Sequence, residues 1–185
     1  LLLKSIAVFC GSRNGASEQY TIGAVALGKE LAKRNITLIY GGSSIGLMGT
    51  IADTVLQEGG KVIGVMPRML ADREIAHKNL TELHIVETMH ERKAKMAELS
   101  DGFIAMPGGA GTLEEFFEVF TWAQIGIHRK PLGLYNVHHY YEPLRALLNH
   151  MADEQFMSET HRTLAHIEDD ACTLLDCFIN NQAVL

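Results

Sequence analysis

The chain of 185 residues is acidic, with a formal net charge of −6, 47% hydrophobic residues and 21% charged residues. This composition is ordinary for a soluble globular protein, and the length predicts a single domain over residues 1–185 that can bury its own core. The negative charge argues against a nucleic-acid partner, because such proteins carry a basic field. No window approaches the ~18 apolar residues of a membrane span, so we expect no membrane partner.

The three cysteines, Cys10, Cys172 and Cys177, form neither a CxxC pair nor a zinc-ligand spacing. An odd and sparse count suits a reducing compartment, and we expect all three to pack as small apolar groups. The first ten residues, LLLKSIAVFC, lack a basic region or a cleavage-site pattern and are typical of a strand rather than a signal peptide. These features together predict a cytoplasmic protein.

Short apolar runs alternate with amphipathic stretches along the whole chain. The runs predict strands at 5–12, 36–42 and 102–109, each with a glycine turn, further strands at 61–67, 83–87 and 131–135, and a weak strand at 164–167. Between and after them, helices are predicted at about 17–34, 51–60, 88–100, about 112–126, near 141–152 and from about 169. Residues 67–82 are expected to form a long polar loop.

Strand runs that are apolar throughout and separated by helices predict a doubly wound, Rossmann-like α/β fold with a parallel sheet covered on both faces. Ligands of such folds bind at the carboxyl ends of the strands. Three glycine clusters follow strands there: Gly11, the group from Gly41 to Gly49, and the group from Gly108 to Gly111. They indicate a phosphate site, with tight turns between strands and helices as the alternative explanation.

Two common nucleotide motifs are absent. Counted from Gly109, the third glycine of a G-x-G-x-x-G fingerprint would fall on Glu114, and the segment 41–49 lacks that spacing too. Neither segment is a Walker A loop, because no Lys-Ser/Thr pair follows the glycines. A nicotinamide dehydrogenase and an ATPase are therefore disfavoured.

Thr112 and Glu115 have two possible roles. The segment T-L-E-E matches a capping box, with Thr112 as N-cap and Glu115 at the third helical position. On a helix over 88–100, however, Arg92 shares a face with Met89, Met96 and Leu99, where an unpaired cation is costly. Arg92 either extends along the helix margin into solvent or has a partner, for which Glu115 or a bound phosphate is available. The adjacent histidines, His138 and His139, fit no metal geometry and receive no role.

The segment MHERKAKM, followed fourteen residues after Arg92 by MPGGAGTLEE, resembles the Lonely Guy family of cytokinin-activating phosphoribohydrolases. Residues 107–115 match the family pattern P-G-G-x-G-T-x-x-E at every fixed position, and residues 40–53 and 121–136 are also similar. The resemblance implies hydrolysis of a purine riboside 5′-monophosphate to the free base and ribose 5-phosphate. It requires no cofactor and no metal, and it suggests a homodimer with sites near the interface. Many relatives carry the label lysine decarboxylase, but nothing here resembles a pyridoxal phosphate lysine site.

By position, the resemblance assigns catalysis to Arg92 and Glu115. It assigns substrate binding to Glu74, Lys93, Gly109, Ala110, Gly111, Thr112 and Thr121, and we add Gly108, Gly42, Ser43 and Gly46 from the glycine turns as phosphate-binding positions. Both AMP and an N6-substituted nucleotide remain candidates, because no motif marks a pocket for the substituent. The alternative function is a carrier that resembles molybdenum-cofactor carrier proteins, which would need the glycine turns but no carboxylate beside a sugar. A dehydrogenase is a distant third possibility.

Overall fold

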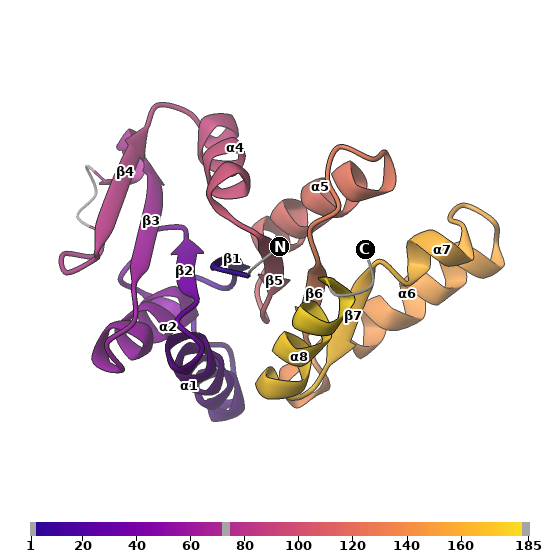
Figure 1. The fold of residues 1–185 in the computed structure, drawn as a ribbon, viewed down its shortest axis with the longest axis horizontal. Coiled ribbons are helices and arrows are strands. Elements are labelled where there is room, and N and C mark those ends of the chain that lie inside the picture. Colours follow the sequence, from indigo (N-terminus) through magenta and orange to yellow (C-terminus); the bar gives the residue numbers. More distant parts are fainter. Residues whose placement is uncertain (1–2, 72–74, 183–185) are drawn as a thin grey trace.

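A computed structural model describes residues 3–71 and 75–182, and it contains one parallel sheet of seven strands in the order β4-β3-β2-β1-β5-β6-β7 (Figure 1). The strands are β1 Ser5–Phe9, β2 Thr37–Tyr40, β3 Val62–Pro67, β4 Glu82–Val86, β5 Gly102–Ala105, β6 Leu132–Tyr135 and β7 Ala165–Glu168. The predicted doubly wound α/β fold is confirmed, including the weak seventh strand.

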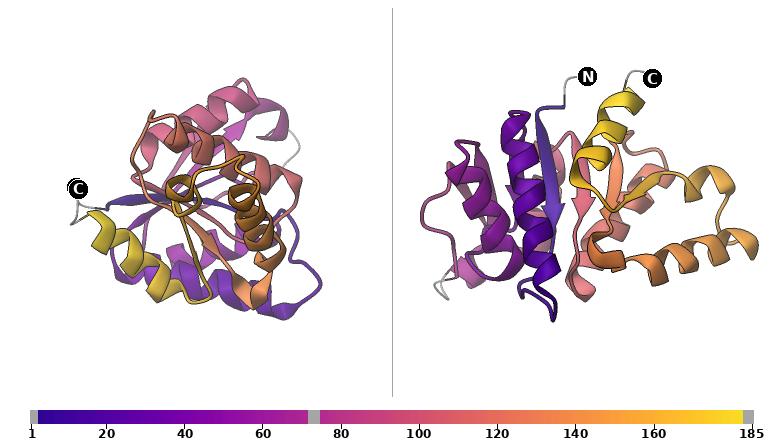
Figure 2. Two further views of the ribbon diagram at one scale, coloured as in Figure 1. Left: turned by 90° about the vertical axis from the view of Figure 1, so that its right-hand side faces the viewer. Right: turned by 90° about the horizontal axis from the view of Figure 1, so that it is seen from below.

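Helices cover both faces of the sheet. The helices are α1 Glu18–Lys33, α2 Gly46–Gln57, α3 Arg68–Ala71, α4 Met89–Leu99, α5 Ala110–Gln124, α6 Glu142–Asp153, α7 Glu159–Arg162 and α8 Ala171–Gln182, with a 3-10 turn at Val137–His139. One core cluster lies between the sheet and α1, α2 and α8, and the other lies between the sheet and α4, α5 and α6. The hairpin of α6 and α7 extends beyond the β7 side of the sheet (Figure 2).

Alternating side chains of the central strand serve the two cores. Ile6 and Val8 pack into the first cluster, whereas Ala7 and Phe9 pack into the second, and all four are at most 4% exposed. Such a strand is apolar at every position because both of its faces are covered. The edge strand β4 is different: none of its five residues is fully buried, so the expectation of strands that are apolar throughout does not hold there.

Two expectations about the elements, and one about the cysteines, were wrong. Helix α2 begins at Gly46 rather than at residue 51, because the glycines at 46 and 49 belong to the helix and not to a long turn. The expected loop at 67–82 contains the short helix α3. The cysteines also differ from expectation: Cys10 is buried, but Cys172 and Cys177 are only partly buried, and the Cys172 sulfur accepts a hydrogen bond from Arg34 at 3.1 Å.

Candidate functional site

The chain reverses its direction of growth across the sheet at β1. Strands β2, β3 and β4 are added on one side of β1, and β5, β6 and β7 on the other. The turns that follow β1 and β5 therefore lie side by side at the carboxyl edge, and the Gly11 N–H donates to the Pro107 carbonyl at 3.0 Å. Ligands of open α/β sheets bind at this switch point.

The turn after β5 requires glycine at position 108. A Cβ atom on Gly108 would collide with the Thr112 hydroxyl and would lie 3.0 Å from the Gly11 nitrogen. Gly46 is comparable, since a Cβ there would collide with the backbone of Ser12 and Arg13. The three glycine clusters of the sequence thus meet at one edge, as predicted.

Helix α5 starts immediately after this turn, with Gly109 as its N-cap and without a side-chain cap. Of the two roles considered for Thr112 and Glu115, the capping box is therefore excluded, because Thr112 already lies at the third helical position. The first amide of the helix with a backbone acceptor is that of Leu113, which donates to the Gly109 carbonyl at 3.2 Å. Throughout residues 3–71 and 75–182, no acceptor is found for the N–H groups of residues 108–112. A helix N-terminus with free amides favours an anion.

Helix α4 carries Arg92 inward. Thr88 caps this helix by accepting a hydrogen bond from the Glu91 N–H, and Arg92 then lies on the same side as the buried Met96. Arg92 is 9% exposed, and its Nη2 lies 3.4 Å from the Glu115 Oε1 of α5. Gly41 leaves room for the guanidinium, because a Cβ atom there would collide with Nη2. The predicted proximity of Arg92 and Glu115 is confirmed.

This buried pair retains unused hydrogen-bonding capacity. The Arg92 Nε is buried and has no partner in the part of the chain that the structure describes. At 3.4 Å the Arg92–Glu115 contact is an ion pair with weak geometry, and both side chains are only 11% exposed. Burial raises the pKa of the Glu115 carboxyl, and the Arg92 charge opposes that rise. Buried polar groups are normally satisfied, so the unsatisfied Nε of an arginine that lines a cavity indicates a ligand.

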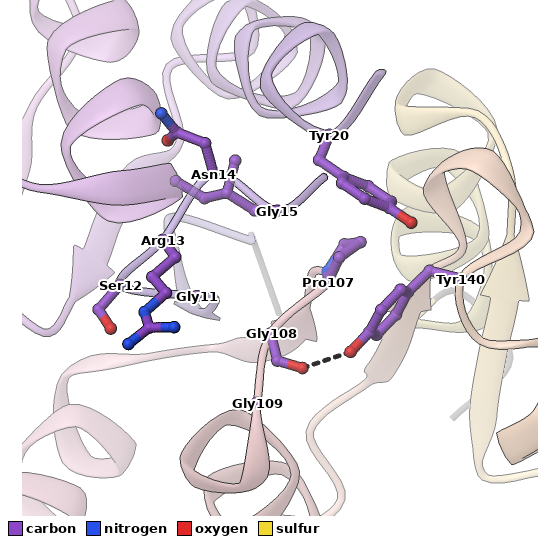
Figure 3. A pocket seen from close by; sticks show the side chains of 11 residues that line it. Gly11, Ser12, Arg13, Asn14, Gly15, Tyr20, Pro107, Gly108, Gly109 and Tyr140 are labelled. Atoms are coloured by element: carbon purple, nitrogen blue, oxygen red, sulfur yellow. Dashed lines mark hydrogen bonds between the residues drawn. The ribbon is translucent and has the colours of Figure 1, made fainter. Parts of the chain in front are cut away.

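A cavity of about 300 Å³ opens between the pair and the start of α5. It is lined by Cys10, Gly11, Ser12, Met48, Met89, Arg92, Gly109, Gly111, Thr112, Glu114 and Glu115. A second cavity of about 420 Å³ shares Gly11, Ser12 and Gly109 with the first and continues towards Tyr20 and Tyr140 (Figure 3). Together they offer a nucleotide-sized space on both sides of the glycine turn.

Cys10 is the thiol of the first cavity. Burial, and secondarily the charge of Glu115, raise its pKa far above the ordinary value. The group therefore stays protonated at neutral pH, which argues against a nucleophilic cysteine.

The other predicted binding residues either line neither cavity or lie outside the described residues. Lys93 pairs with Glu114 and, at 3.1 Å, with Glu118, and the hydrogen bond to Glu114 raises its pKa. Ala110 is the first residue of α5, and Thr121 is exposed on the same helix outside both cavities. Glu74 lies outside the described residues.

The turn after β2 supports the site rather than lining it. The Gly42 carbonyl accepts from the His77 N–H at 2.9 Å, and the Ser43 hydroxyl accepts from the Ile45 N–H at 3.3 Å. Gly46 packs against the turn after β1, and neither cavity includes these three predicted residues.

Several lining residues were not predicted. Ser12 follows Gly11 directly, so the glycine turn was a usable signal for it. Tyr20, Met48 and Tyr140 come from three separate elements and share no sequence motif.

One group of side chains in the described ranges could approach a metal ion. Ligand atoms of His139, Glu142 and Asp169 lie within 4.8 Å of one another, but all three residues are exposed. The Asn136 amide donates to both carboxylates at 2.7 Å, so these acids already have partners. Among the described residues, no helix has the length and apolar character needed to cross a membrane.

The chain is similar in sequence to a described family and to several named proteins. The family described as possible lysine decarboxylase matches residues 48–178. The chain is 49% identical over 161 residues to the cytokinin riboside 5′-monophosphate phosphoribohydrolase of Rhodococcoides fascians, covering 86% of the chain and 81% of that protein. It is 53% identical over 159 residues to a phosphoribohydrolase of the same description from Arabidopsis thaliana, covering 86% and 75%.

Among solved structures, the Moco carrier protein from Chlamydomonas reinhardtii superposes with a TM-score of 0.75 at 20% identity, covering 100% of both chains. The molybdenum cofactor binding protein from Rippkaea orientalis superposes with a TM-score of 0.70 at 19% identity, covering 100% of this chain and 98% of the other. At this level of identity, the likeness establishes the fold alone.

Proposed function

The chain belongs to the Lonely Guy family, within the group described as possible lysine decarboxylase, and from this premise we propose that it hydrolyses the N-glycosidic bond of purine riboside 5′-monophosphates. The substrates would be AMP or its N6-substituted, cytokinin-type derivatives. The observation that carries the proposal is the buried Arg92–Glu115 pair: among the described residues the Arg92 Nε has no partner, and the nearby amides of residues 108–112 have no acceptor.

In the proposed reaction, the oxygen of a water molecule adds to C1′ of the ribose and the C1′–N bond breaks. The departing base takes up a proton, and the products are the free base and ribose 5-phosphate. The sugar passes through an oxocarbenium-like state, which a carboxylate stabilises. Glu115 supplies that carboxylate and orients the water, since it lies beside the cavity and away from bulk solvent.

Arg92 has two roles in this proposal. Its charge favours the ionised form of Glu115, against the effect of burial. Its Nε has no hydrogen-bond partner among the described residues, and a guanidinium that lines the cavity suits contacts with phosphate or sugar oxygens. The amides of Gly108, Gly109, Ala110, Gly111 and Thr112 hold the 5′-phosphate at the start of α5.

The remaining predicted positions are proposed in supporting roles. Lys93 neutralises Glu114 and Glu118 beside the site, and Gly42, Ser43 and Gly46 shape the neighbouring turn. We retain Glu74 and Thr121 as substrate-binding positions on the family resemblance. We also propose a cytoplasmic homodimer, in line with the sparse cysteines and the family.

Lysine decarboxylation is not supported by the residues of the site. Pyridoxal phosphate chemistry uses a lysine that forms a Schiff base. The residues lining the two cavities include no lysine in the described parts of the chain.

The experiment is release of base from AMP and from N6-isopentenyl AMP, followed chromatographically. We expect Glu115→Gln to lower turnover by about 10²-fold or more while ligand binding persists, because the neutral amide cannot stabilise positive charge. Glu114→Gln is the matched control, since Glu114 is the exposed neighbour, and it should retain turnover within about threefold. A folded wild-type protein that binds these nucleotides without releasing base would instead support the carrier function.

A further inference from the structure

The phosphate-binding turn is fixed by hydrogen bonds to its carbonyl groups. Four consecutive carbonyls, those of residues 106–109, each accept one. The Tyr141 hydroxyl donates to Met106 at 2.6 Å, the Gly11 N–H to Pro107 at 3.0 Å, the Tyr140 hydroxyl to Gly108 at 2.6 Å and the Leu113 N–H to Gly109 at 3.2 Å. Two of the four donors are thus adjacent tyrosines that follow β6.

Tyr140 controls the orientation of one amide in particular. The Gly108 carbonyl and the Gly109 N–H belong to the same planar trans peptide, so they point in opposite directions. A hydroxyl that holds the carbonyl therefore directs the Gly109 N–H to the opposite side. A Gly-Gly peptide has little intrinsic preference between its two orientations, because neither residue has a Cβ. The external donor supplies that preference.

The loop that carries Tyr140 is itself firmly held. Asn136 is fully buried; its side-chain oxygen accepts from the Tyr141 N–H at 2.7 Å, and its amide donates to Glu142 and Asp169. His138 and His139 both adopt positive φ angles, 52° and 58°, which few non-glycine residues do. Such conformations persist only where the surroundings impose them. His138 and His139, to which the sequence alone assigned no function, thus lie in the turn that positions Tyr140 and Tyr141.

Tyr140 is not needed for the core. It is 39% exposed, and its ring forms T-shaped pairs with the Tyr20 and Tyr141 rings, whose centroids are 5.7 Å and 5.1 Å away. Its hydroxyl is directed at the Gly108 carbonyl across the second cavity (Figure 3). An exposed tyrosine that donates a short hydrogen bond to a ligand-binding turn is more readily explained by the turn than by packing.

We propose that Tyr140 is a positioning residue for the 5′-phosphate: its hydroxyl holds the Gly108 carbonyl and thereby keeps the Gly109 N–H directed for the anion. The inference rests on the proposed function in one respect, namely that the amides of residues 108–112 bind the phosphate. It assigns Tyr140 an effect on affinity for the phosphate rather than on bond cleavage at the sugar.

The test is Tyr140→Phe, which removes the hydroxyl and keeps the ring. We expect the affinity for ribose 5-phosphate, measured by isothermal titration calorimetry, to fall about three- to tenfold, as for the loss of one hydrogen bond. KM for AMP should rise by a similar factor, whereas kcat changes less than about twofold. Binding of adenosine, which lacks the phosphate, should be unchanged.

Tyr135→Phe is the matched control, because Tyr135 lies in β6 outside both cavities and its hydroxyl makes no hydrogen bond among the described residues. It should leave all these values unchanged. Equal weakening of adenosine and ribose 5-phosphate, or a lower kcat at constant KM, would overturn the role of Tyr140. If wild-type protein binds ribose 5-phosphate in a Tyr140-dependent way but releases no base, the proposed hydrolysis fails and the positioning role stands.

Discussion

Glu115 and Arg92 indicate a functional site only when they are considered together. A carboxylate at the start of a helix has an ordinary explanation in the helix dipole, and an arginine on a partly apolar face has one in its long stem. In the structure both side chains are 11% exposed and lie 3.4 Å apart, and the buried Arg92 Nε has no hydrogen-bond partner among the described residues. The missing hydrogen bond distinguishes this pair from a structural salt bridge.

The pH dependence of turnover follows from this environment. In the proposed reaction Glu115 stabilises positive charge and so must be ionised, and burial raises its pKa. Turnover should therefore fall as the pH drops through that raised pKa, at a higher pH than for an exposed glutamate. Arg92→Gln removes the charge that lowers the pKa, so the acid limb of the kcat–pH profile should move to higher pH. Arg92→Lys keeps the charge and should move the limb less, although both variants turn over slowly.

These profiles can be measured on the residual activity of each variant with AMP. If the acid limbs of Arg92→Gln and Arg92→Lys coincided, Arg92 would not influence the ionisation of Glu115. The proposed role of the charge would then be wrong, whatever the loss in rate.

At the scale of elements, two T-x-x-E segments have different roles. In T-M-H-E, Thr88 is the N-cap of α4; its hydroxyl accepts from the Glu91 N–H at 3.1 Å, and Glu91 accepts from the Glu87 N–H at 2.8 Å. In T-L-E-E, the helix has already begun at Ala110, so Thr112 lies within it. The same four-residue pattern thus caps one helix and lies inside the other, where Thr112 and Glu115 line the first cavity, because the preceding Gly109 takes over the N-cap.

This difference predicts unequal effects on stability. Thr88→Val should lower the free energy of unfolding by about 1 kcal/mol, the usual cost of losing an N-cap side chain. Thr112→Val should change it by less than about 0.5 kcal/mol, because the hydroxyl caps nothing. Urea unfolding of the two variants provides the comparison. Equal losses would restore the capping role of Thr112.

The sequence predicts the elements better than their starts. The runs in β1 and β5 are apolar at nearly every position, so their burial on both faces can be read directly. The start of α2 was missed because Gly46 and Gly49 resemble turn residues. Glycine is required at both positions because other backbone atoms approach closely. A Cβ on Gly46 would collide with the backbone of Ser12 and Arg13, and a Cβ on Gly49 with that of Ser44. The contact of Gly46 with Ser12 and Arg13 joins segments far apart in the sequence and leaves no local pattern.

In the site, too, some residues could be predicted from the sequence and others could not. The register of α4 predicts that Arg92 points inward, and the adjoining strand and turn predict Glu115 as its neighbour. Tyr140 lies 32 residues beyond the Gly108 carbonyl that it holds, and only the pairing of β5 with β6 brings them together. Helical periodicity identifies groups on one helix, whereas a hydrogen bond between two loops depends on the order of the strands.

At the scale of the molecule, the exposed side of α5 is relevant to the proposed homodimer. Thr121 and Ile125, four residues apart, lie on the same side of this helix region, and Ile125 and Ile127 are 68% and 64% exposed. Thr121 is six residues beyond Glu115, about 9 Å along a helix axis, and outside both cavities of its own chain. A substrate contact by Thr121 is therefore most readily made in the site of a second copy. This supports the proposed homodimer, with α5 at or near the interface.

Light scattering coupled to size-exclusion chromatography tests this arrangement. We expect wild-type protein at micromolar concentration to have twice the 20.4-kDa mass of the chain. Ile125→Glu should yield monomers and lower turnover at least about tenfold, because a buried unpaired charge opposes association and the site loses its second copy. Phe156→Glu is the matched control, since Phe156 is 88% exposed on a different segment, between α6 and α7. A dimer that survives Ile125→Glu but dissociates with Phe156→Glu would move the interface to that hairpin and leave Thr121 without a route to substrate.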